Sequence, residues 1–74
     1  MNLHDFLYSL VSIYQQIVIY DYRNDGESGA VKLYEGSNNS CPYTNDQTDE
    51  VANLKVDGVD AVDGVLCIDV GITA

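Results

Sequence analysis

The chain has 74 residues, of which twelve are Asp or Glu and three are Lys or Arg, so its formal net charge is −9. Nucleic-acid phosphates and anionic membrane leaflets repel such a surface, whereas a basic protein attracts it over long range. The chain is nevertheless 46% hydrophobic and contains six Tyr, which excludes a disordered acidic tail and predicts a single small folded domain over residues 1–74.

The first predicted element is an amphipathic helix over residues 3–15. Its apolar residues recur at the i, i+3, i+4, i+7 spacing that places one apolar stripe on a helix. Asn2 is expected to cap the helix, and Asp5 complements the positive end of the helix dipole. The stripe consists of Leu3, Phe6, Leu7, Leu10, Val11, Ile13, Tyr14 and Ile17.

β-Branched and aromatic residues follow and predict a β-hairpin over residues 17–35, with a turn-rich connection between its strands. Which face of the strand at 17–22 is buried stays open. Simple alternation along the strand at 30–35 places Tyr34 on the same face as Lys32.

Residues 36–50 are polar and turn-forming and are expected to form a loop. Because fifteen residues without structure are long for so small a domain, a short helical turn near 46–54, capped by Asn45 or Thr48, is an alternative. Without such a turn, this segment is expected to be mobile or to contact a partner.

The C-terminal part predicts a second hairpin, because Asp63-Gly64 is a strong type I′ turn signal. One face of this hairpin is apolar and is expected to pack on the helix, while the other shows acid to solvent. The fold class is therefore α+β: one N-terminal amphipathic helix on a four-stranded, mainly antiparallel sheet made of two hairpins. Counting outward from the turn pairs Val62 with Val65, Ala61 with Leu66, Asp60 with Cys67, Val59 with Ile68, Gly58 with Asp69 and Asp57 with Val70.

The sequence contains no catalytic or metal-binding motif. His4 is the single histidine and is expected on the surface of the helix. Cys41 and Cys67 lack zinc-site spacing and are expected to be free thiols, with one disulfide as the alternative. The acids at 57–63 invite a calcium site, but a hairpin alternates their faces. We therefore predict a protein without catalytic activity, cofactor or metal.

The acids themselves are the candidate functional residues. With three basic residues, the chain lacks the cationic face that direct nucleic-acid binding requires. No apolar run approaches the length of a membrane span and no signal-type segment opens the chain, so a soluble cytoplasmic protein is expected. The predicted partner-binding surface consists of Asp46, Asp49, Glu50, Asp57, Asp60, Asp63 and Asp69, and Asp25 and Glu27 add charge in the first hairpin turn.

Three tyrosines, Tyr20, Tyr22 and Tyr34, are candidate aromatic anchors for a partner. They share one face of the first hairpin if the alternation of its strands is regular. Packing of these rings against the loop at 36–50 is the alternative to an exposed interface.

The layout of the chain resembles small acidic proteins of phages and mobile elements of Gram-positive bacteria, some of which are anti-CRISPRs or other inhibitors of host defence that act as DNA mimics. The likeness covers residues 3–15, 17–35 and 62–70, with Ile-Val-Ile-Tyr-Asp, Lys-Leu-Tyr-Glu-Gly and Val-Asp-Gly-Val-Leu-Cys-Ile-Asp-Val as its strands. It implies a partner class, a basic nucleic-acid-handling protein of a bacterial host cell such as a CRISPR effector, and no particular residues.

Two functions from different classes follow. The first is a non-enzymatic inhibitor or interaction protein that blocks the nucleic-acid groove of a basic host protein. The second is a structural or self-associating module, a homodimer formed through a sheet edge or the tyrosine face. In the second case the acidity serves solubility alone.

Overall fold

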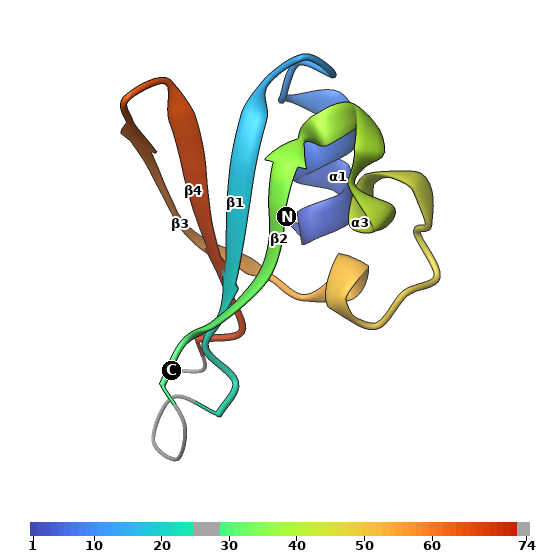
Figure 1. The fold of residues 1–74 in the computed structure, drawn as a ribbon. Helices are drawn as coiled ribbons and strands as arrows, with labels where there is room; N and C mark the ends of the chain where they lie inside the picture. The colour runs from blue at the N-terminus through green and yellow to red at the C-terminus, as the bar shows by residue number, and fades with distance from the viewer. Residues whose placement is uncertain (25–28, 73–74) are drawn as a thin grey trace.

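An N-terminal helix and two β-hairpins make up the fold, which confirms the predicted α+β class (Figure 1). The computed structural model describes residues 1–24 and 29–72. Asp25 and Glu27 therefore lie outside the described residues. The elements are α1 (Leu3–Ser9), β1 (Gln16–Asp21), β2 (Val31–Ser37), the 3-10 turn η1 (Asn38–Ser40), α3 (Pro42–Asn45), the 3-10 turn η2 (Val51–Asn53), β3 (Val56–Val62) and β4 (Val65–Val70).

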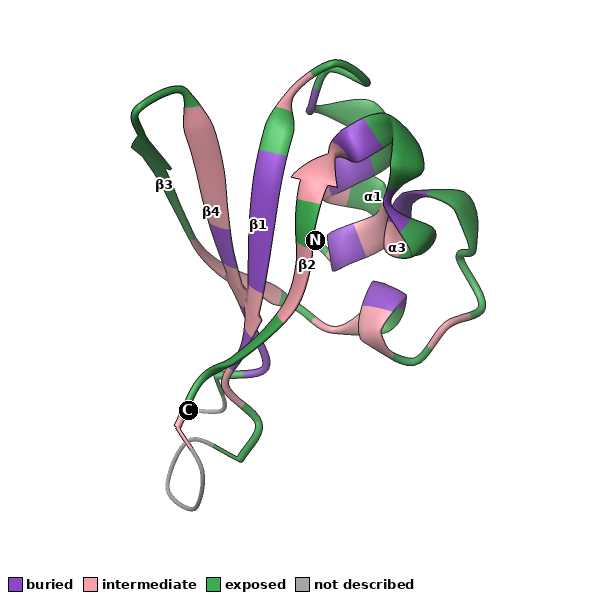
Figure 2. Ribbon diagram, in the orientation of Figure 1, coloured by how far each residue is buried: buried purple, intermediate pink, exposed green. Residues whose placement is uncertain are grey.

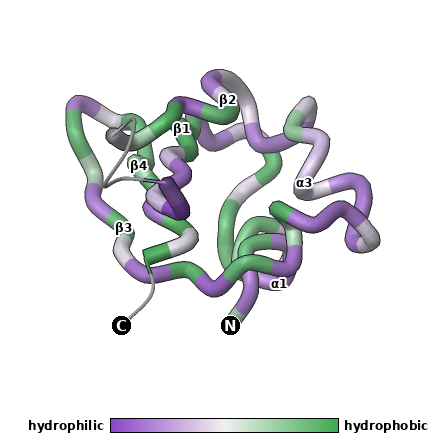
Figure 3. Tube along the Cα trace, turned by 90° about the horizontal axis from the view of Figure 1, so that it is seen from below, coloured by the Kyte–Doolittle hydropathy of each residue, from purple (hydrophilic) through white to green (hydrophobic). Residues whose placement is uncertain are grey.

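The four strands form one mixed sheet in the order β2-β1-β4-β3. Both hairpins are antiparallel, as predicted, and they join through a parallel pairing of β1 with β4. Seen from below, the strands follow a curve from β2 to β3, and α1 and α3 lie across from it (Figure 3). β2 and β3 are the two edge strands, so each has one side without a strand partner in the sheet.

The turn of the second hairpin has the predicted type I′ character, since Asp63 and Gly64 both have positive φ values, 52° and 80°. The register counted from this turn is confirmed over most of the hairpin. The confirmed pairs are Val62 with Val65, Ala61 with Leu66, Asp60 with Cys67, Val59 with Ile68 and Gly58 with Asp69.

A β-bulge at Asp57 ends this regular register, and Val56 pairs with Val70 in its place. The predicted pairing of Asp57 with Val70 is therefore wrong, because a bulge inserts one extra residue into a strand. The Asp57 carboxylate accepts a hydrogen bond from the backbone N–H of Ile72 at 2.8 Å. Asp57 thus holds the chain that follows β4 against the start of β3.

A second bulge changes the faces of the first hairpin. Ile19 pairs with Tyr34, but the next residue, Tyr20, pairs with Lys32, so that Leu33 is the extra residue. Lys32 and Tyr34 therefore lie on opposite faces of the sheet, and the prediction that they share one is wrong.

Helix α1 is shorter than the predicted 3–15 and ends at Ser9. Its start is as predicted, because the Asn2 side chain accepts a hydrogen bond from the backbone N–H of Asp5 at 2.8 Å. Ser and β-branched residues occupy positions 11–13, where they favour helix less than straight-chain residues do. The helical stripe therefore stops before its last predicted members.

Asn38 determines where the helix ends. It is fully buried, and its Nδ2 donates to the carbonyl oxygens of Leu7, Val11 and Ser12 at 2.9, 3.2 and 3.3 Å. Its Oδ1 accepts a hydrogen bond from the Thr44 hydroxyl at 2.6 Å. One side chain thus satisfies backbone oxygens that a continuing helix would have bonded internally.

The segment at 36–50 is not an open loop, because η1 and α3 form within it and α3 contacts α1. The alternative of a short helical turn within 46–54 is confirmed by η2. The predicted caps Asn45 and Thr48 are wrong: Glu50 is at the N-cap position, and the Asp49 carboxylate accepts the Val51 N–H at 2.8 Å.

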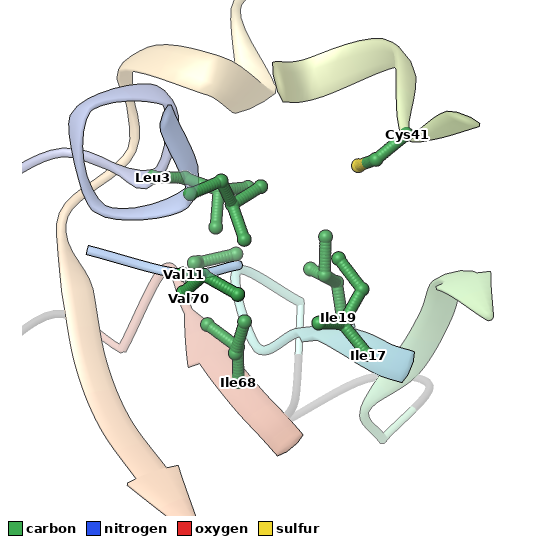
Figure 4. Packing of buried hydrophobic residues seen from close by; sticks show 8 residues of the cluster. Leu3, Val11, Ile17, Ile19, Cys41, Ile68 and Val70 are labelled. Atoms are coloured by element: carbon green, nitrogen blue, oxygen red, sulfur yellow. The ribbon is translucent and has the colours of Figure 1, made fainter. Parts of the chain in front are cut away.

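The core lies between α1 with its following turn and the concave face of the sheet. Its side chains point toward one another from distant parts of the chain, with Cys41 reaching in from the start of α3 (Figure 4). The fully or nearly fully buried members are Leu3, Leu7, Val11, Ile17, Ile19, Cys41, Ile68 and Val70.

The predicted apolar face of the second hairpin is buried only in part. Ile68 and Val70 are fully buried, whereas Val59 and Ala61 on the edge strand β3 are exposed (Figure 2). The helical layer does not reach the far end of this hairpin. Val18 is also buried, so side chains on both faces of β1 are buried near the middle of the strand.

Both cysteines are free thiols, as predicted. Cys41 is buried beside Ile17 and Ile19 in the core cluster, whereas Cys67 is half-buried and pairs in register with Val18. Since Val18 faces away from the core side of β1, the two thiols lie on opposite sides of the sheet.

Candidate functional site

The seven predicted acids separate into two groups. The first belongs to the second hairpin, and two of its members lie on the sheet face that turns away from α1. We call this face the outer sheet face; it carries Val18, Tyr20, Asp60, Cys67 and Asp69. Asp60 is exposed there, Asp63 is exposed at the hairpin tip, and Asp57 sits at the edge-strand bulge.

Asp69 is half-buried and lies over Gly58 of the neighbouring strand. The Asp69 Oδ2 atom is 3.3 Å from the position that a Cβ would take at Gly58. The absence of a side chain at Gly58 therefore leaves room for this carboxylate on the outer sheet face. Asp60 and Asp69 project from neighbouring strands of the same surface.

The second group, Asp46, Asp49 and Glu50, lies outside the sheet, in the segment between α3 and η2. All three of these carboxylates have partners within the chain: Asp49 accepts the Val51 N–H and Glu50 pairs with Arg23. Asp46 Oδ1 accepts from the N–H and hydroxyl of Thr48 at 2.9 and 2.6 Å, and these bonds lower the pKa of Asp46. The two groups belong to different elements, and the nearest link between them is Arg23, which pairs with Glu50 and lies against Gly71 beside the Asp57 bulge.

The three tyrosines do not share a face. Tyr20 lies on the outer sheet face, where register places it between Lys32 and Asp69. Tyr34 packs against the core on the other face, and its hydroxyl donates to the Ser37 carbonyl at 2.6 Å. Tyr22 follows the end of β1. Tyr34 therefore packs within the protein, as the alternative to an exposed interface predicted. Tyr20 is the tyrosine that lies on the same face as Asp60 and Asp69.

Two of the three basic residues are already paired within the chain. Arg23 forms a bidentate pair with Asp21, at 2.9 to 3.1 Å, and its third nitrogen reaches Glu50 at 3.3 Å. Lys32 pairs with Glu35 at 2.9 Å. Among residues 1–24 and 29–72, no ion pair neutralises the carboxylates of Asp46, Asp49, Asp57, Asp60, Asp63 or Asp69.

The Asp21–Arg23 pair predicts a dependence of stability on pH. Asp21 is 7% exposed, and hydrogen bonds from Arg23 hold its pKa below the ordinary value of 3.8 even though burial opposes this shift. A carboxyl with a lowered folded-state pKa stabilises the fold above its unfolded-state pKa, and this contribution disappears as pH falls through the folded-state pKa. We expect Asp21→Asn to lower the free energy of unfolding by about 2 kcal/mol at neutral pH.

The measurement is urea unfolding of both proteins over a range of pH. The difference between wild type and Asp21→Asn should be constant above about pH 5 and should shrink below about pH 4. A difference that persists unchanged at the lowest pH at which both proteins fold would contradict the assignment of this stabilisation to the ionised carboxylate.

His4 joins the helical elements to each other. Its Nδ1 lies 3.0 Å from the carbonyl oxygen of Tyr43, and its ring stacks on that of Tyr8 with centroids 5.5 Å apart. The contact with Tyr43 connects α1 with α3, and the stacking on Tyr8 lies within α1. Within the part of the chain that the structure describes, no three His, Cys, Asp or Glu side chains gather as a metal site requires.

One surface was missed by sequence reasoning. Tyr8, Leu10, Ile13 and Tyr14 are exposed, although the predicted helix placed three of them in a buried stripe. Their only sequence signal was the run of Ser and β-branched residues that ends the helix early.

No protein-family model, curated protein or solved structure matches this chain. Among the helices of the described residues, none is long and apolar enough to cross a membrane.

Proposed function

We propose that this protein is a non-enzymatic interaction protein that binds a basic nucleic-acid-handling protein, such as a CRISPR effector, in the cytoplasm of a bacterial host cell. It blocks the groove that the nucleic acid would occupy. The supporting observation is the set of carboxylates on the second hairpin, Asp57, Asp60, Asp63 and Asp69, which no ion pair of the described residues neutralises. The resemblance to small acidic phage proteins points to the same partner class.

The hairpin suits this role because its acids stand on a rigid element. Asp60 and Asp69 project from paired strands, and Asp63 occupies a tight turn whose geometry is fixed. Carboxylates held at fixed spacing attract a cationic groove over long range and then accept charge-assisted hydrogen bonds from Arg and Lys. Tyr20, beside Asp69, supplies an aromatic anchor on the same face.

The test is a direct binding measurement with purified basic nucleic-acid-binding proteins, including a guide-loaded CRISPR effector. Binding is expected to weaken steeply with rising salt and to be competed by duplex DNA. Asp60→Lys with Asp63→Lys should weaken it by more than about tenfold, because both changes place like charges against the cationic groove. Both side chains are exposed. Asp63→Lys adds backbone strain of up to about 1 kcal/mol at a φ of 52°, so folding should be retained and is checked by circular dichroism.

The matched control is Asp5→Lys with Ser9→Lys and Gln47→Lys. The hairpin variant and this control each change the charge by +4, from −9 to −5, but the control alters exposed side chains of the helical layer. The control is expected to retain most of the affinity. Equal loss in both variants would attribute binding to net charge alone, and full tolerance of the hairpin variant would exclude the hairpin as the site.

A further inference from the structure

Four large apolar side chains are exposed at the end of α1 and in the turn that follows. Tyr8 is 72% exposed, Leu10 64%, Ile13 50% and Tyr14 80%. We call these four residues the α1-end patch. Figure 2 shows most of this turn as exposed, with short buried and intermediate stretches. Exposed large side chains are ordinary when scattered, but four within seven residues make this turn a candidate interaction surface.

A groove of about 360 Å³ adjoins the patch. It runs between the end of α1 and the segment of η1 and α3, and two members of the patch form part of its wall. The lining residues are Leu7, Tyr8, Ile13, Asn39, Thr44 and Asn45. The patch therefore combines projecting side chains with a recess beside them.

This surface is built from the uncharged parts of the chain. Residues 6–20 and 36–45, which supply the patch and the whole lining of the groove, contain no Asp, Glu, Lys or Arg. Fifteen charged residues occupy the remainder of the 74-residue chain. This surface is therefore uncharged on a molecule that is otherwise strongly acidic, and this difference bears on the kind of partner that binds here.

We propose that the occupant of the α1-end patch is a second copy of this chain. Two molecules of charge −9 repel each other wherever carboxylates meet. The patch and its groove carry none themselves and have Asp5 and Asp46 only at their border, so self-association costs least there. A basic partner, by contrast, has no electrostatic attraction to a neutral face and is attracted to the acidic residues instead. The long-range electrostatics therefore oppose self-association least at the patch and leave the acidic hairpin for other proteins.

A two-fold dimer uses the same patch on both copies, so each must carry both the projecting and the receiving part. Tyr14, the most exposed member, projects from the turn, and the groove beside Ile13 receives Tyr14 of the second copy. The chain runs directly from this turn into β1, which is buried along most of its length and holds the patch in place.

The dimer has a characteristic response to salt that does not depend on the proposed function. Screening weakens the repulsion between the two acidic bodies, so dimerisation is expected to tighten as ionic strength rises. Binding of a basic protein through the acids weakens under the same change. Each proposal can therefore fail without the other.

The experiment is sedimentation equilibrium of the full chain between about 0.01 M and about 1 M salt, over which the Debye length falls from about 30 Å to about 3 Å. The dimer dissociation constant should decrease with salt. Leu10→Ser with Tyr14→Ser should weaken dimerisation at high salt by about tenfold or more, since it removes two aromatic or aliphatic anchors. The single variant Tyr14→Glu, which places a carboxylate in the patch, should have the same effect.

The control is Val59→Thr with Val62→Thr, which removes exposed apolar surface from edge strand β3 and is expected to leave the dimer unchanged. Circular dichroism of each variant checks that the monomer is folded. A protein that stays monomeric at high salt and high concentration overturns the proposal, and so does a dimer that survives Tyr14→Glu. A dimer lost in the β3 control instead places the interface at the sheet edge.

Discussion

Replacement of Asn38 by Ala is expected to lower the free energy of unfolding by about 3 kcal/mol or more, because each buried polar group left without a partner costs about 1–3 kcal/mol. The variant removes the donor to three carbonyl oxygens at the end of α1 and the acceptor for the Thr44 hydroxyl. A domain of 74 residues has only about 4–11 kcal/mol of stability. The Asn38→Ala variant is therefore expected to lose a large share of its stability and to unfold at a clearly lower urea concentration and temperature.

Urea unfolding followed by circular dichroism measures this loss, and two variants calibrate it. Asn39→Ala changes an exposed neighbour and should stay within about 0.5 kcal/mol of wild type. Thr44→Val leaves the donors of Asn38 in place and removes one hydroxyl partner, so we expect a loss of about 1 kcal/mol. If Asn38→Ala were no less stable than Asn39→Ala, Asn38 could not be the group that ends the helix.

Asn38 also explains why the length of α1 could not be predicted from the sequence. The apolar spacing at 3–15 is a local signal and continues past Ser9, but the bonds that end the helix come from a residue 26 or more positions later. Neither helix propensity nor capping rules contain that information. The start of the helix was predicted correctly, because it depends only on Asn2 and its immediate neighbours in the sequence.

In the hairpins too, the features set by neighbouring residues were predicted and the others were not. Asp63-Gly64 fixed the turn and the first five pairs of its hairpin, because type I′ geometry sets the register of both strands. The bulges at Leu33 and Asp57 have no such signal. Each shifts the register by one residue, and the shift at Leu33 moves Tyr34 from the expected outer face to the core.

The candidate site was predictable as a list of residues but not as a surface. The net charge and the sparse basic residues are properties of composition, so the choice of acids followed from the sequence. Their separation into two groups depends on the parallel pairing of β1 with β4, which joins elements far apart in the chain. That pairing places Asp69 beside Tyr20 and leaves Asp46, Asp49 and Glu50 with the helical layer.

Gly71→Ala is expected to destabilise the fold by about 3 kcal/mol, through backbone strain of about 1 kcal/mol and a steric clash of about 1–3 kcal/mol. Gly71 has a φ of 80°, which disfavours any residue with a Cβ. A Cβ there would lie 2.6 Å from Arg23 Cγ and 2.9 Å from Asp21 Oδ1, so the ion pair between these residues must shift. Thermal and urea unfolding of the variant measure the loss.

Gly64→Ala separates the two causes. Gly64 has the same φ of 80°, but no atom lies within 4 Å of the position of its missing Cβ. Gly64→Ala should therefore lose about 1 kcal/mol from strain alone. The excess loss at Gly71 measures how closely the C-terminal chain approaches the Asp21–Arg23 pair.

A double variant identifies the group that the clash disturbs. In an Asp21→Asn background Arg23 no longer makes a bidentate ion pair, so its side chain can move away from a Cβ at residue 71. The loss from Gly71→Ala should then be smaller than in the wild-type background, since contacting residues are not additive. Equal losses at Gly71 and Gly64, or strict additivity with Asp21→Asn, would mean that the C-terminal chain does not hold Arg23 in place. Arg23 would then be held only by its ion pairs with Asp21 of β1 and Glu50 at the start of η2.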